Sequence, residues 1–111
     1  MFKARNFRRI NNQNTLNQEA VRMEFQRESG RIYAMDGDKL VAEVTFPAQD
    51  GVAVIDHTFV DDSLRGQGVA GKLVRAAVDQ IRADGQKAAV TCSYAKVWFQ
   101  NHPEESDLLK D

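Results

Sequence analysis

Three short segments near the start of the chain are strand-like, and apolar and polar residues alternate along the first and the third of them. The segments are 21–28 (VRMEFQRE), 31–35 (RIYAM) and 39–46 (KLVAEVTF). Alternation with a period of two is typical of strands that bury one face. Asp36-Gly37, which separates the second segment from the third, is a strong signal for a two-residue hairpin turn. We therefore predict three consecutive antiparallel strands.

A nearly continuous apolar run, VAVIDHTFV at 52–60, follows the break PAQDG at 47–51. A strand of this kind is expected to be central in its sheet and covered on both faces. Joined to the first three strands by short turns, it completes an antiparallel meander of four strands.

The hydrophobic period then changes from two to about four. Four apolar residues spaced four apart predict one buried stripe of a helix: Val69, Leu73, Ala77 and Ile81. Asp84-Gly85 ends this helix, with glycine as a left-handed cap. A fifth strand at 87–94 (KAAVTCSY) is expected to run parallel to the fourth, because a helix connects the two. A short helix at 95–100 ends before His102-Pro103. The predicted order is β-β-β-β-α-β-α, an α/β fold of the α+β type with a mixed sheet.

Length and composition place the chain among ordinary globular proteins and exclude several classes. The 111 residues fit one domain, 42% are hydrophobic, and the net charge is −1. This balance argues against nucleic-acid binding, which needs a surplus of Lys and Arg. No apolar run approaches the ~20 residues that span a membrane. The lone Cys92 allows no internal disulfide, and no residue cluster has metal-ligand spacing. Without a visible secretory signal, we expect a cytoplasmic protein.

The first 18 residues differ from the rest of the chain. They hold four cations, no acid and a polar run, NNQNTLNQ. We expect residues 1–18 to be a poorly ordered extension, and 19–111 to be the functional domain. A transit peptide, or a contact for an acidic partner, is the alternative.

The glycine-rich stretch LRGQGVAGKLV, residues 64–74, matches three nucleotide-binding patterns at once. Residues 66–71 fit the dinucleotide pattern G-x-G-x-x-G, but hairpins precede the stretch where that fold needs repeated β-α units. The same residues nearly fit a phosphate-binding P-loop, but Leu73 stands where that motif needs Ser or Thr to hold magnesium. Both matches are interpreted as accidental.

The third pattern, Arg/Gln-x-x-Gly-x-Gly/Ala, fits residues 65–70 and belongs to folds in which a meander precedes the loop. In such a loop, backbone N–H groups and the helix N-terminus surround a pyrophosphate. Gly68 lets the backbone approach the phosphates closely, and Arg65 adds charge-assisted hydrogen bonds.

Together with this loop, three further motifs resemble the small single-domain branch of the GNAT acetyltransferase superfamily. They are His57-Thr58, Cys92-Ser93-Tyr94 and His102-Pro103. The resemblance covers 21–109. It implies that acetyl-CoA lies between splayed strands four and five, with its pantetheine arm paired to the backbone near Phe59 and Val60. It also implies that the pyrophosphate lies on six loop residues: Arg65, Gly66, Gln67, Gly68, Val69 and Ala70. Asn101 would close over the cofactor arm, although a helix C-terminus explains it equally well.

The catalytic residues are less clear than the loop. Larger members of the superfamily often use a tyrosine as the acid, and Phe99, which cannot donate a proton, stands at the matching position. Cys92 could instead accept the acetyl group, protonate the leaving thiolate, or be structural. Tyr94 is a substitute acid or a packing residue. His57 is a general base or a hydrogen-bonded histidine of the sheet.

The leading hypothesis is therefore an acetyl-CoA-dependent N-acetyltransferase that acts on a small amine or an exposed protein amine. With so short a chain, a second subunit of a homodimer could complete the acceptor side. The alternative is a CoA- or acyl-CoA-binding module without turnover. A weaker possibility is an interaction protein that uses its basic leader.

Overall fold

The computed structural model describes residues 24–110, so the predicted leader at 1–18 and the first three residues of the predicted strand at 21–28 lie outside it. Seven strands form two small sheets. The first sheet has the order β1-β2-β3-β6, with every neighbouring pair antiparallel. Its strands are β1 (Gln26–Glu28), β2 (Arg31–Asp36), β3 (Lys39–Thr45) and β6 (His57–Val60). The second sheet has the order β4-β5-β7, from β4 (Ala48–Gln49), β5 (Val52–Ile55) and β7 (Lys87–Val90).

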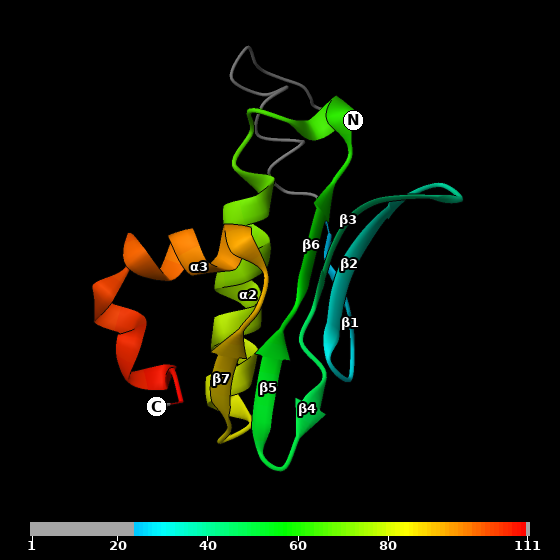
Figure 1. The fold of residues 1–111 in the computed structure, drawn as a ribbon. Coiled ribbons are helices and arrows are strands. Elements are labelled where there is room, and N and C mark those ends of the chain that lie inside the picture. Colours follow the sequence, from blue (N-terminus) through cyan, green and yellow to red (C-terminus); the bar gives the residue numbers. More distant parts are fainter. Residues whose placement is uncertain (1–23, 111) are drawn as a thin grey trace, which may run out of the picture.

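The predicted fourth strand is split between these two sheets. Asp56 separates β5, which pairs in parallel with β7, from β6, which pairs with β3. Figure 1 shows β5 and β7 side by side at one end, whereas β6 continues beside β3. The splay between the fourth and fifth predicted strands is thereby confirmed. The expectation that this strand is covered on both faces is wrong for β6, because His57 and Phe59 are exposed after the chain leaves the second sheet.

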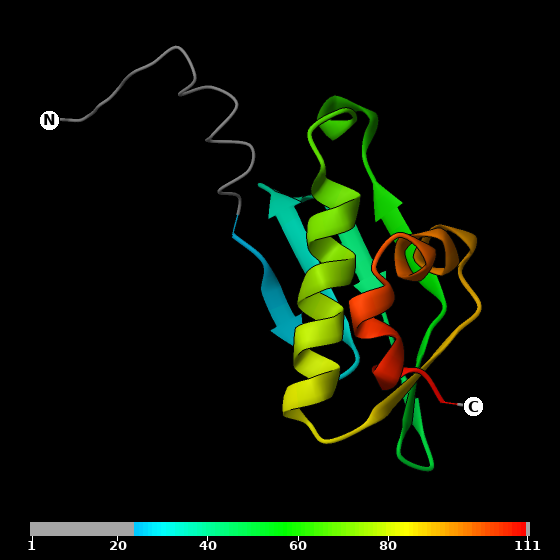
Figure 2. The same ribbon diagram turned by 90° about the vertical axis from the view of Figure 1, so that its left-hand side faces the viewer.

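Helix α2 (Val69–Ala83) forms the centre of the core. The four residues of its predicted stripe are all buried, and they pack with apolar residues of both sheets. Figure 2 shows α2 lying across the strands of the first sheet. The helix ends at the predicted position, where Asp84 is the C-cap and Gly85 has a φ of +72°.

The chain after β7 departs from the predicted strand at 87–94. The backbone N–H groups of Thr91 and Cys92 both donate to the carbonyl of Ile55, at 3.0 and 3.1 Å, and the chain then turns into α3 (Ser93–Gln100). The strand therefore ends at Val90, and Cys92 is the N-cap of α3. A 3₁₀ segment, η2 (Pro103–Leu108), follows and packs back toward α2 through ion pairs. No helix within residues 24–110 is long and apolar enough to cross a membrane.

Candidate functional site

The loop between β6 and α2 begins with a short 3₁₀ turn, η1 (Asp62–Leu64). The Asp61 carboxylate caps this turn by accepting hydrogen bonds from the backbone N–H of Ser63 at 3.0 Å and from its hydroxyl at 2.6 Å. These two bonds, helped by Lys39 at 3.3 Å, hold the pKa of Asp61 below its ordinary value. These interactions of Asp61 therefore hold in place the start of the loop that follows β6.

Two glycines with positive φ then lead into the helix. Gly66 has a φ of +81° and Gly68, the N-cap of α2, has a φ of +75°. Gly68 has no side chain to cap the helix, so the first backbone N–H groups of α2 are available to a ligand. A Cβ atom added at either glycine would meet no atom within 4 Å. The loop is thus open above a helix N-terminus, a geometry that favours an anion.

A cavity of about 330 Å³ lies over this loop and extends to β6 and α3. Its wall includes five of the six predicted loop residues, all except Gln67, together with Val60. Two side chains differ from the expected pattern. The Arg65 guanidinium is exposed and pairs with Asp62 at 2.6 Å, and Gln67 turns inward, where its Oε1 has no hydrogen-bond partner among the described residues. The side chain of Val69 belongs to the core, whereas Ala70 is half-buried.

Beside this cavity, β6 presents one edge of its backbone to the splay. The N–H of Asp61 donates to the carbonyl of Val41 at 2.8 Å, and in an antiparallel pair such bonded positions alternate along the strand. Together with the register of β3 and β6, this turns the backbone of Phe59 toward β3 and leaves the backbones of Thr58 and Val60 facing the splay. A pantetheine-like chain would therefore pair with Thr58 and Val60 rather than with Phe59.

Cys92 lies across the splay from Thr58. Its Sγ is 3.5 Å from the Thr58 hydroxyl, and the thiol is partly buried. Burial raises the pKa of the Cys92 thiol, but hydrogen bonds from the Thr58 hydroxyl and from the backbone N–H groups of Ala95, Tyr94 and Thr58 outweigh it, so the pKa lies below its ordinary value. The site stabilises the thiolate form of Cys92.

The two aromatic residues considered for an acid point to different places. The hydroxyl of Tyr94 lies over Gly71, 3.5 Å from the position that a Cβ atom there would take, so it contacts the first turn of α2. Phe99 is buried, stands edge-on to Trp98, and borders a separate apolar groove beside β7. Tyr94 thus lies between the loop cavity and a second cavity located between α2 and α3, whereas Phe99 lines neither of them.

His57 lies on the face of β6 opposite Thr58, because neighbouring residues of a strand point to opposite faces. Its Nε2 is 3.4 Å from Oε1 of Glu43 on β3, and the other carboxylate oxygen of Glu43 accepts a hydrogen bond from Arg31. About half of the His57 side chain is exposed. His57 is therefore a polar residue of the sheet with an accessible ring. This placement is compatible with a general base and with a hydrogen-bonded histidine of the sheet.

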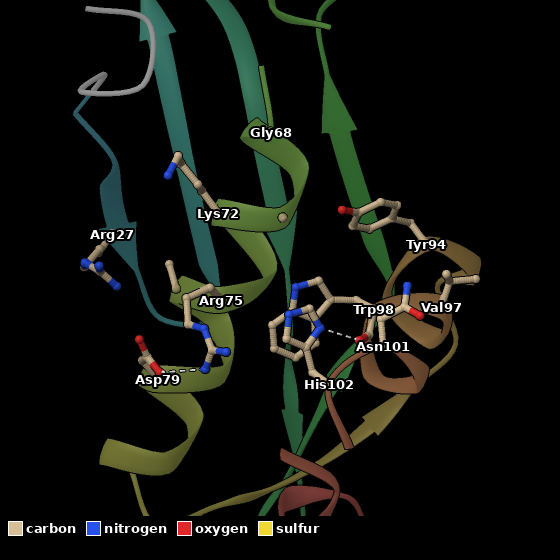
Figure 3. Close-up of a pocket in the computed structure, with 12 residues that line it drawn as sticks. Arg27, Gly68, Lys72, Arg75, Asp79, Tyr94, Val97, Trp98, Asn101 and His102 are labelled. Carbon is tan, nitrogen blue, oxygen red and sulfur yellow. Dashed lines mark hydrogen bonds and ion pairs between the residues drawn. The ribbon is translucent and has the colours of Figure 1, made fainter. Parts of the chain in front are cut away.

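A larger cavity, of about 580 Å³, adjoins the first one between α2 and α3 (Figure 3). Asn101 lines it and also serves as the C-cap of α3. Three basic residues of this wall are not among the site residues predicted from the sequence: Arg27, Lys72 and Arg75. Lys72 directly follows the glycine loop and could have been noticed there, whereas Arg27 comes from β1 and only the fold brings it close. No group of His, Cys, Asp and Glu within the described residues could hold a metal ion.

Comparisons with known proteins agree on one family. The family profile described as GCN5-related N-acetyl-transferase matches residues 31–108. The solution structure of a GCN5-like protein from Staphylococcus aureus is 31% identical and has a TM-score of 0.66, and the match covers 79% of this chain and 88% of that one.

Two further matches are more distant. The ribosomal-protein-S18-alanine N-acetyltransferase of Escherichia coli is 13% identical, with a TM-score of 0.53 over 69% of this chain and 50% of that chain, and shows the fold alone. Protein NATD1 of Homo sapiens is 36% identical over 55 residues, which is 48% of this chain and 49% of that protein. The chain thus matches about half the length of this curated relative.

Proposed function

The chain belongs to the GCN5-related N-acetyltransferase family, and from this membership we propose that it binds acetyl-CoA and transfers the acetyl group to an amine. The observation that carries the proposal is the loop with Gly66 and Gly68 in the left-handed region, which opens on a cavity at the N-terminus of α2. The splay beside the loop supplies a free strand edge. A pyrophosphate followed by an amide-containing arm fits this sequence of features.

The residues present fit such a ligand in three respects. The two glycines leave space where a side chain would collide with a phosphate. Arg65 is exposed at the loop and can exchange its partner Asp62 for a phosphate. Val60, whose backbone faces the splay, lines the same cavity. When bound, acetyl-CoA would supply the activated acyl group.

At the reacting end, we place the thiol of Cys92. The hydrogen bonds around Sγ favour the thiolate, which suits a group that accepts an acetyl group better than one that donates a proton. The amine acceptor would approach from the opposite face of the first sheet, where Figure 1 shows none of the described helices. His57 and Glu43 lie on that face, and we assign to His57 the role of the base that takes a proton from the amine.

Residues 24–110 leave the acceptor side open, which suits an exposed protein amine as well as a small molecule. A second copy of the chain could also line it. We further propose that the protein acts in the cytoplasm.

Melting temperatures with acetyl-CoA, CoA, ATP and NAD, measured in parallel, test the proposal. A ligand at about 100 times its Kd adds roughly 2.7 kcal/mol of stability, which is on the order of ten degrees for a domain of this size. We expect a shift with both CoA species and little with ATP or NAD. The absence of a shift with either CoA species would overturn the proposal. Binding without acetylation of any amine in a panel of peptides and small amines would instead favour a binding module.

Acetylation of Cys92 is followed by intact mass. We expect wild-type protein incubated with acetyl-CoA to gain one acetyl group and to lose it when an amine is added. The C92S variant should bind CoA without forming this labile adduct. A C92S variant with full turnover would exclude a nucleophilic thiol while leaving acetyl transfer in place.

A further inference from the structure

The 580 Å³ cavity is lined by β1, α2 and α3, and its two sides differ in chemistry. Figure 3 shows Arg27, Lys72 and Arg75 on one side, and Tyr94, Val97 and Asn101 on the other. One side therefore presents cations, and the other an amide, a phenol and an apolar side chain. A volume of this size is in the range of small-molecule sites.

The three cations are not equally available. Arg75 donates to Glu105 at 2.7 Å, lies 3.7 Å from Asp79, and has its guanidinium 5.0 Å from the ring of Trp98. Among residues 24–110, no carboxylate lies within ion-pair distance of Arg27 or Lys72. These two cations can therefore receive an anion without first losing a protein partner.

The charge of this wall contrasts with the charge of the surrounding domain. Residues 24–110 contain ten Lys and Arg against fourteen Asp and Glu. In the cavity wall, three cations stand against one acid, Asp79, which is already paired with Arg75. This wall is therefore a part of an otherwise acidic domain that presents a favourable potential to an anionic group.

The cavity adjoins the loop cavity. Gly68, Gly71 and Tyr94 line both. Lys72 lies one helical turn after Gly68, so its side chain starts about 6 Å along α2 from the loop. A ligand whose pyrophosphate rests on the loop can therefore place its next anionic group against Lys72 and Arg27.

We propose that Lys72 and Arg27 bind a terminal phosphomonoester of the ligand whose pyrophosphate lies on the loop. This inference rests on the proposed function, in which the ligand is CoA and the phosphomonoester is its 3′-phosphate. Lys72 and Arg27 are then specificity-determining residues that distinguish CoA from dephospho-CoA, which lacks only this group. The α3 side of the cavity would contact the uncharged part of the nucleotide.

Calorimetric titration of the full chain with CoA and with dephospho-CoA tests the inference. Hydrogen bonds to charged groups contribute about 1.5–3 kcal/mol, so wild-type protein should bind CoA at least about tenfold more tightly than dephospho-CoA. The K72Q and R27Q variants should each lower this ratio, and the double variant should bring it close to one. The Kd for dephospho-CoA should stay the same in all of them.

K96Q is the matched control, because Lys96 is an exposed lysine of α3 that does not line this cavity. It should keep the wild-type ratio, and the melting temperature of each free variant shows that it is folded. Equal binding of the two ligands by wild-type protein would overturn the inference while leaving the proposed function intact. A ratio that survives in the double variant would overturn the assignment to Lys72 and Arg27. Failure of both ligands to bind would overturn the proposed function as well.

Discussion

The Thr58 hydroxyl lies 3.5 Å from Sγ of Cys92 and so connects β6 with the N-terminus of α3 across the splay. The two residues are 34 positions apart in the chain. Their contact joins the strand edge that we propose pairs with the ligand to the thiol that we propose accepts the acetyl group. It also contributes to the lowered pKa of Cys92, whose thiolate it stabilises.

Replacing Thr58 should therefore change the reactivity of Cys92. In a T58V variant, the hydroxyl is lost while the β-branched shape is kept, so the thiol becomes less acidic. We expect alkylation by iodoacetamide at neutral pH to slow several-fold, because the thiolate is the reacting form. T58S, which retains the hydroxyl, should react at nearly the wild-type rate. Equal rates in T58V and wild-type protein would show that the backbone N–H groups alone set the reactivity.

Gly68 should affect both stability and ligand binding. A side chain at a φ of +75° is strained by roughly 1–2 kcal/mol, so G68A should lower the free energy of unfolding by about that amount. G37A is a matched control, because Gly37 has a φ of +62° and also has open space around it, but it lines neither cavity. Both variants should lose similar stability in urea unfolding, and only G68A should lose affinity for CoA.

Phe99 tests whether the tyrosine common in larger members of the superfamily could be restored. We expect F99Y to show no gain in acetylation rate, because Phe99 is buried beside Trp98 and away from the loop cavity. The buried hydroxyl should instead destabilise the fold by about 1–3 kcal/mol if it finds no partner. A rate increase in F99Y, measured at saturating acetyl-CoA, would contradict this placement.

His57 should affect the chemical step more than CoA binding. In H57N, kcat for amine acetylation should fall about 10²-fold or more, since a positioned base contributes 10²–10⁴-fold. The Kd for CoA should remain near the wild-type value, because His57 lies on the opposite face of β6 from Thr58. An H57N variant with unchanged kcat would identify His57 as a structural partner of Glu43.

Acid should destabilise the junction between η2 and α2. Hydrogen bonds from Arg75, and then from Arg82, lower the pKa of Glu105 from its ordinary value of 4.5. A carboxyl group with a lowered pKa stabilises the fold at pH values above 4.5, and this contribution is lost as the pH falls through the lowered pKa. We expect the melting temperature of wild-type protein to fall in this range, and that of E105Q to depend less on pH. Parallel curves for the two proteins would contradict this role of Glu105.

Local pattern was sufficient for most of the fold and for the loop. Alternation predicted β3, and the spacing of Leu73, Ala77 and Ile81 predicted the buried face of α2. The break at Asp56 could not be read in this way, because the polar pair Asp56-His57 can also occur within one continuous strand that has an exposed face. The predicted strand at 87–94 is too long for a related reason. The N–H groups of Thr91 and Cys92 both donate to one carbonyl, that of Ile55, so the regular pairing with β5 stops there.

The cation wall illustrates the same limit for the site. Arg27 and Lys72 are 45 positions apart in the sequence, and only the packing of α2 against the first sheet brings them to one cavity. A lysine in a helix is ordinarily a solvated surface residue, and the one signal along the chain that marks Lys72 is its place directly after the glycine loop. The distinction comes from the cavity wall and from the lack of a carboxylate partner among the described residues.

The break of one strand at Asp56 has a consequence for how the sequence of the proposed ligand-binding edge of β6 can change. Its edge consists of main-chain groups of Thr58 and Val60, and every residue except proline carries the same N–H and C=O. Substitutions along β6 can therefore alter side chains while the backbone N–H and C=O groups of this edge remain. If the proposed function holds, this edge recognises its ligand largely independently of residue identity. Mutational scans of β6 should accordingly tolerate many side chains at position 60 and reject proline.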